Sequence, residues 1–184
     1  MTTKTVTWKI DPAHTSATIA ARHMMLTTVR ASLAGVNGEL EFDPEKPEGA
    51  RVRLAIPAAT VNTGDAKRDG HLRSPDFLDV ERHPEITFES THIRKTDDGR
   101  FIVTGDLTIR GTTRPVDVTV ESNGVVQGMN GRVAGFTAKA TVDRTAFGLV
   151  WNMPVPGGVL VSEKLKVEFD LQAVETAAER AAAA

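Results

Sequence analysis

The sequence predicts an all-β fold of antiparallel strands, arranged as a closed barrel or as a sandwich. Apolar and polar residues alternate along about eight segments, as expected for strands with one buried and one exposed face. Runs rich in Asp, Asn, Gly and Pro separate these segments, and most are short enough to join antiparallel neighbours. The 184 residues include 15 Gly and 9 Pro, which suits many short strands better than a few long helices.

The expected strands follow one another along most of the chain. Trp8 begins the first, and the alternating segments lie around residues 17–21, 40–42, 51–56, 86–89, 101–109, 116–120, 136–142 and 165–173. Turns are expected at residues 43–49, 97–99, 110–115, 122–124 and 128–131, because Asp-Gly and Asn-Gly pairs tolerate positive φ.

Two segments do not alternate. Residues 63–74 are polar and end at Pro75, which indicates a short surface helix or an ordered loop. The residues after Glu175 are rich in alanine and have little to bury. The sequence therefore predicts one β domain over residues 5–175 and a tail over residues 176–184 that is disordered or a frayed helix.

Composition excludes several classes of protein. The chain has no cysteine, so it contains no disulfide, no thiolate metal site and no cysteine nucleophile. Its net charge of −2 provides no excess positive field for nucleic acid. The sequence has no run of about 18 apolar residues, so we expect no stable membrane insertion. No secretory signal is visible, so we expect a cytoplasmic protein.

Five histidines raise the question of a metal or ligand site. His23 is in phase with Ile19 and should point inward, and His92 is in phase with Ile86 and Phe88. Two inward histidines could meet inside a barrel and bind a metal or the polar head of a ligand. Alternatively, each is a satisfied interior or rim side chain. We predict no metal site and keep the head-group hypothesis.

The segment 68–77 brings Arg, Asp and His together. A catalytic interpretation makes His71 a general base oriented by Asp69 or Asp65. In the structural interpretation the charges tie a helix or loop to the rim of the fold, and Leu72 and Phe77 anchor it. No nucleophile is marked nearby, so we favour the structural interpretation, predict no catalytic residue and expect a protein that is not an enzyme.

Several blocks of sequence occur in the order found in a known family. They are residues 8–16, 22–25, 38–43, 62–64, 68–77, 83–90, 105–115 and 143–148. On these blocks the chain resembles the YceI family of lipocalin-like, polyisoprenoid-binding proteins. The resemblance implies an extended eight-stranded antiparallel β-barrel with an internal, lipid-sized pocket. It also implies binding of a long isoprenoid or alkyl chain without catalysis, and it suggests a homodimer.

The predicted ligand is a long-chain amphiphile: a polyisoprenoid, an isoprenoid quinone or a fatty-acid derivative. It would be bound, sequestered or transported as a hydrophobic small-molecule partner, and no cofactor is required. Two alternatives stay open: a filled barrel that serves as a stress-related or interaction protein, and an enzyme acting on an isoprenoid. The enzyme would need an inward carboxylate beside a histidine, and the strands show none.

The inward faces of the strands give the predicted site. The residues expected to line the pocket are Ala17, Ile19, Ala21, His23, Leu40, Phe42, Leu54, Ile56, Phe77, Ile86, Phe88, Val103, Leu107, Val118, Phe136, Phe147, Leu165, Val167 and Phe169. The predicted contacts of a polar head group are His23, His92 and Arg68.

Overall fold

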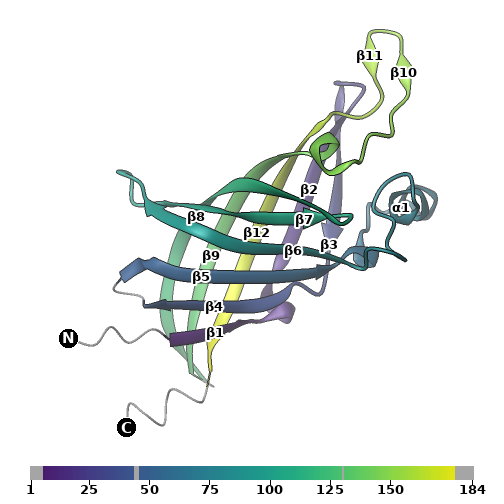
Figure 1. Ribbon diagram of the computed structural model, residues 1–184. Coiled ribbons are helices and arrows are strands. Elements are labelled where there is room, and N and C mark those ends of the chain that lie inside the picture. Colours follow the sequence, from purple (N-terminus) through teal and green to yellow (C-terminus); the bar gives the residue numbers. More distant parts are fainter. Residues whose placement is uncertain (1–5, 44–45, 130, 177–184) are drawn as a thin grey trace.

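Eight antiparallel strands close into a barrel in the computed structural model, which describes residues 6–43, 46–129 and 131–176. This confirms the predicted eight-stranded antiparallel β-barrel. Around the ring, each hydrogen-bonded to the next, the strands are β1 (Val6–Ile10), β4 (Asn37–Asp43), β5 (Lys46–Pro57), β6 (Glu85–Lys95), β7 (Phe101–Ile109), β8 (Thr112–Gly128), β9 (Gly131–Asp143) and β12 (Lys164–Glu175), which pairs with β1 again (Figure 1).

A two-stranded wing extends the sheet beyond the ring. It consists of β2 (Ser16–His23) and β3 (Thr27–Leu33), and the 3-10 helix η1 (Pro12–His14) separates it from β1. Both β1 and β2 pair with β12, at residues 173–175 and 166–170 respectively. The predicted segment 17–21 therefore lies in the wing and not in the closed ring.

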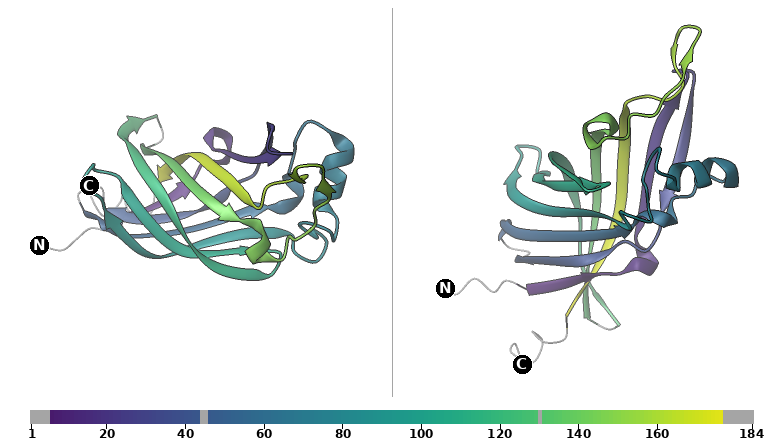
Figure 2. Two further views of the ribbon diagram at one scale, coloured as in Figure 1. Left: turned by 90° about the horizontal axis from the view of Figure 1, so that it is seen from above. Right: turned by 45° about the vertical axis from the view of Figure 1, so that its right-hand side comes forward.

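The tip of the wing contacts a second small hairpin, formed by β10 (Pro154–Val155) and β11 (Gly158–Val159). His23 bridges to Val161, and the Met24 N–H donates to the Leu160 carbonyl at 2.8 Å. Both hairpins project from the barrel on the same side (Figure 2). The sequence analysis did not single out β3, although Val29, Ala31 and Leu33 alternate there with polar residues. It did not predict the β10–β11 hairpin either, because its strands have two residues each and Val159 is exposed.

One predicted turn is wrong, and two are shorter than predicted, because residues 46–49 belong to β5 and residues 112–115 to β8. Residues 122–124 lie inside β8, where the register with β9 shifts between Ser122 and Gly124. Gly124 has φ 103°, so the Asn-Gly pair that can form a hairpin here forms a β-bulge instead. The turn at residues 97–99 is confirmed, with Gly99 at φ 84° between β6 and β7. The strands on either side of 44–45 and of residue 130, which lie outside the described residues, are paired.

The predicted short helix is confirmed as α1 (Ala66–Arg73). Asp65 caps it by accepting the Arg68 N–H at 2.9 Å. With the 3-10 helix η2 (Ala58–Thr60), α1 lies at the end of the barrel opposite the β4–β5 and β6–β7 hairpins (Figure 1). No helix among the described residues is long and apolar enough to cross a bilayer. The predicted tail lies outside the described residues, Thr176 excepted.

Candidate ligand cavity

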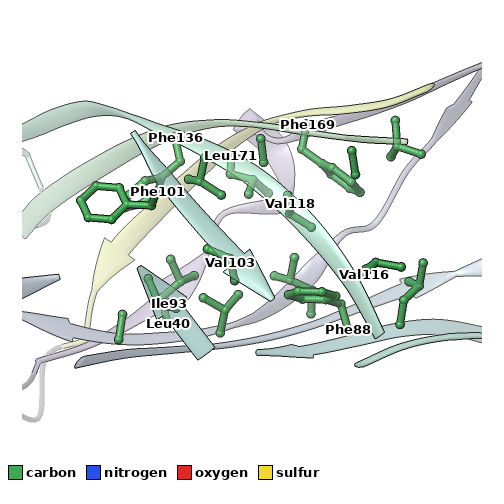
Figure 3. Close-up of a pocket in the computed structure, with 18 of the residues that line it drawn as sticks. Leu40, Phe88, Ile93, Phe101, Val103, Val116, Val118, Phe136, Phe169 and Leu171 are labelled. Atoms are coloured by element: carbon green, nitrogen blue, oxygen red, sulfur yellow. The ribbon is translucent and has the colours of Figure 1, made fainter. Parts of the chain in front are cut away.

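The barrel encloses a cavity of about 570 Å³ whose lining is almost entirely apolar. The alternation of β9 and β12 creates one wall: register pairs place Val167 beside Ala140 and Phe169 beside Ala138, all four facing the cavity. Figure 3 shows aromatic and branched side chains from several strands directed into the same space. This volume falls in the range of roughly 300–1,000 Å³ that is typical of small-molecule sites.

A cluster of buried side chains closes the barrel at the end that carries α1. Phe147 and Leu149, which follow β9, pack with Phe77 and with Val142. Phe147 belongs to the 3-10 helix η3 (Arg144–Phe147) and is 2% exposed. These residues lie beside the cavity lining at Leu107, so the cavity ends at this cluster.

His71 belongs to this end wall. Its ring stands edge-on to Phe77 and Trp151, with centroids 5.0 and 4.7 Å away. Its Nε2 lies 2.9 Å from an oxygen of Asp76, and neither proposed orienting residue is the partner. Asp69 instead accepts the N–H and the hydroxyl of Thr63, and the hydroxyl holds the pKa of that carboxyl below its ordinary value. The contacts support the structural interpretation of this segment.

Arg144 braces the same end. Its buried guanidinium donates to the carbonyls of Ser162 at 2.9 Å, Trp151 at 3.0 Å and Val161 at 3.3 Å, and also to that of Leu149. These carbonyls belong to two separate stretches of chain, before and after the β10–β11 hairpin. Burial lowers the pKa of Arg144, but an arginine starts so high that it stays charged near neutral pH.

The other end of the cavity opens to solvent. Lys95 and Gly99, both exposed, line the cavity at the β6–β7 hairpin, and Pro47 lines it at the start of β5. Of the described residues in the lining, only Thr87, Ser122 and Lys95 have polar side chains. Within the described residues, no group of three or more His, Asp or Glu is placed to hold a metal ion. The site can therefore hold an apolar chain with one end near water.

Most of the predicted lining residues do line the cavity. These are Ile19, Leu40, Phe42, Leu54, Ile56, Ile86, Phe88, Val103, Leu107, Val118, Phe136, Leu165, Val167 and Phe169. The others lie elsewhere: Ala17 is buried in the main core, Ala21 and His23 lie toward the tip of the wing, and Phe77 and Phe147 form the end wall. Whether the lining residues touch a ligand stays a prediction.

None of the three predicted head-group residues lines the apolar cavity. Arg68 is tied to its own segment, since its Nε donates to the Thr63 hydroxyl at 2.7 Å. His92 is exposed on the outer face of β6, because a β-bulge between Ser90 and His92 reverses the alternation. Ile93 takes the inward position and is buried. No Gly or Pro marks this bulge, and its one signal in the sequence is that Ile93 is out of phase with Ile86 and Phe88.

The bulge also explains why two lining residues of β6 were not predicted. After it, Ile93 and Lys95 face the cavity, and among the residues that the structure describes Lys95 is the only charged one in the lining. Further lining residues, among them Phe101 and Val116, lie on strands whose alternation was recognised. The alternation rule, applied to every residue of those strands, would have found them.

A closed antiparallel β-barrel with an apolar internal cavity, walled at one end and open at the other, defines the class of this protein. The chain belongs to the YceI family: the YceI-like domain matches residues 8–173. A UPF0312 protein of Pseudomonas putida (strain F1) is 30% identical over 171 residues, covering 92% of this chain and 80% of that protein.

Solved structures share the fold. Burkholderia cenocepacia BcnA superposes with a TM-score of 0.75 at 22% identity, over 89% of this chain and 98% of that one. A polyisoprenoid-binding domain from Saccharophagus degradans, implicated in plant cell wall breakdown, gives a TM-score of 0.66 at 12% identity, over 94% of this chain and all of that one. At these identities the likeness concerns the fold alone.

Proposed function

We propose that this protein binds a long-chain amphiphile in its barrel and sequesters or transports it. The observation that supports this most is the cavity itself: about 570 Å³, apolar along its length and open at one end. The ligand class is a polyisoprenoid, an isoprenoid quinone or a fatty-acid derivative. The structural similarity to a polyisoprenoid-binding domain supports the first of these.

The driving force is burial of the chain. At ~0.8 kcal/mol per CH₂ group, about twenty buried carbons contribute on the order of 16 kcal/mol before costs. Ordering a flexible chain and losing translational freedom offset much of this. A net affinity between micromolar and nanomolar is expected, and it should depend on chain length more than on any single contact.

The lining also bears on the two alternatives. A filled barrel would leave no open space, whereas Phe88 and Phe136 here border an unfilled cavity. An enzyme would need an acid and a base near the chain, and the described part of the lining offers only two hydroxyls and one ammonium. Both features favour a binding protein. The cytoplasmic location and the homodimer stay predictions.

The test combines mass spectrometry with a matched pair of variants. The purified protein is analysed in its native state and after solvent extraction, and then titrated with a fluorescent polyene fatty acid. Val118→Trp fills the cavity, whereas Val126→Trp adds the same ring on the outside of the same strand, where Val126 is 66% exposed. We expect Val118→Trp to weaken binding at least tenfold and Val126→Trp to leave it unchanged.

A protein that is purified empty and rejects prenyl and fatty probes alike would refute the proposal. So would equal binding by both tryptophan variants, provided that circular dichroism shows both to be folded.

A further inference from the structure

The barrel wall is open between β5 and β6 near the mouth, the end of the cavity that opens to solvent. Register pairs between the two strands end at Arg53↔Glu89, although β5 begins at Lys46 and β6 continues to Lys95. Beyond that pair, within the described residues, β5 pairs only with β4 and β6 only with β7. The two strands therefore separate and leave a fork in the sheet.

The Ser90 side chain ends the hydrogen bonding between β5 and β6 at the point where the two strands separate. The Val52 N–H donates to the Ser90 hydroxyl at 2.9 Å, which satisfies this group without a backbone partner on β6. The β-bulge between Ser90 and His92 follows at once. A bulge bends its strand and increases its twist, so it directs β6 away from β5.

The fork connects the apolar cavity to a polar groove. The groove has a volume of about 350 Å³ and carries charges of both signs: it includes Arg51, Ser90, His92 and Glu48, together with the ion pair of Arg53 and Glu89. Ala50, Val52 and Ile93 border both the groove and the cavity. An amphiphile at the fork could keep its chain inside the barrel while its head meets water and polar groups.

Lys95 is the last residue of β6, on one side of the fork, and it lines the cavity at its mouth. Within the described parts of the chain, no acidic residue forms an ion pair with its ammonium. Asp98, in the adjacent turn, is engaged by Arg100 and by the Thr96 hydroxyl, and Asp97 is exposed in the same turn. A single cation on the rim of an apolar cavity complements a ligand with one negative charge at the end of its chain.

We propose that Lys95 binds the anionic head group of the amphiphile, a carboxylate or a phosphate, at the fork between β5 and β6. His92 and Arg51, in the groove on the other side of the fork, supply further polar contacts to a larger head. The inference rests on the proposed function, because it requires the chain of the ligand in the cavity.

The neighbouring residue provides the control. Arg94 is also exposed and cationic, but it alternates onto the outer face of β6 and does not line the cavity. Lys95→Met and Arg94→Met therefore remove the same charge from opposite faces of one strand. Each is titrated with four probes in two pairs: oleic acid with oleyl alcohol, and geranylgeranyl phosphate with geranylgeraniol.

We expect Lys95→Met to weaken binding of the two anionic probes five- to tenfold and to leave both alcohols within twofold of the wild type. Arg94→Met should change none of the four. Because the Lys95 ammonium is exposed, the preference for the anions should also shrink as salt is raised. If only the acid or only the phosphate responds, that result identifies which head group the site takes.

Two results would overturn the inference in distinguishable ways. If wild type and Lys95→Met bind each anion as well as its alcohol, or if both variants lose affinity equally, Lys95 is not a head-group site, and chain binding stands. If no probe binds the wild type, the proposed function fails and the head-group site fails with it.

Discussion

Replacing Arg144 by methionine should strongly destabilise the fold. Arg144 is 3% exposed, and its guanidinium donates to four backbone carbonyls from two stretches of chain. Methionine preserves much of the apolar stem but supplies no donor, so these carbonyls lose their shared partner. The carbonyls of Leu149 and Trp151 are held at the end wall of the cavity, where Phe147 and Leu149 pack.

The size of the effect follows from these contacts. A hydrogen bond to a charged group contributes about 1.5–3 kcal/mol, and a buried polar group left without its partner costs about 1–3 kcal/mol. Some of the carbonyls will accept hydrogen bonds from water once the two stretches of chain move apart. With four carbonyls affected and some of them rehydrated, we expect Arg144→Met to lose about 3–5 kcal/mol. Arg144→Lys should lose about 2 kcal/mol, because a lysine ammonium lacks the planar fork that reaches both stretches.

Urea unfolding followed by far-ultraviolet circular dichroism measures these differences by linear extrapolation. Arg110→Met is the control, since Arg110 is half-buried and makes one bond, to the Gly148 carbonyl at 3.1 Å. That variant should lose less than about 1 kcal/mol. A loss of under about 1 kcal/mol for Arg144→Met would refute the view that this residue holds the end wall together.

The remaining predictions concern pH and two positions in the wall. The Thr145 hydroxyl lowers the pKa of Asp143, so the ionised carboxylate stabilises the folded state above the ordinary carboxyl pKa, and this contribution is lost as the pH falls below about 4. In Asp143→Asn, the free energy of unfolding should therefore fall less steeply on acidification, as measured by urea titrations at several pH values. A Cβ on Gly105 would lie 2.6 Å from the Glu89 carbonyl oxygen, so Gly105→Ala should cost about 1–3 kcal/mol in thermal or urea unfolding, and an unchanged midpoint would contradict the packing. Ser90→Ala should cost about 1 kcal/mol and speed the release of a bound polyene probe in stopped-flow, since it removes the bond that ends the fork; unchanged release would argue against the fork as a route.

The alternation of apolar residues predicted most of this fold, because each strand of the ring has one face toward a dry interior. Ile86 and Phe88 on β6 show where the rule works. His92, on the same strand, shows where it fails: one extra residue in a bulge reverses every side chain that follows.

The end wall shows a second limit. Phe77 and Phe147 are as apolar as the cavity residues, but the path of the chain brings them together over the end of the barrel. Alternation reports which side chains avoid water. It cannot report whether they face each other or an empty space, since that depends on contacts between residues far apart in sequence.

The junction of β1 with β12 also determines the order in which the molecule can assemble. Residues 8–10 and 173–175 close the ring, so the contact that completes the barrel joins segments from nearly opposite ends of the sequence. Closing so long a loop is entropically costly and slow. During synthesis, all strands from β1 to β9 emerge before β12, with the edges of β1 and β9 unpaired until it arrives. The cavity therefore comes into existence only with the last strand, and a nascent chain has no compartment in which to hold a lipid.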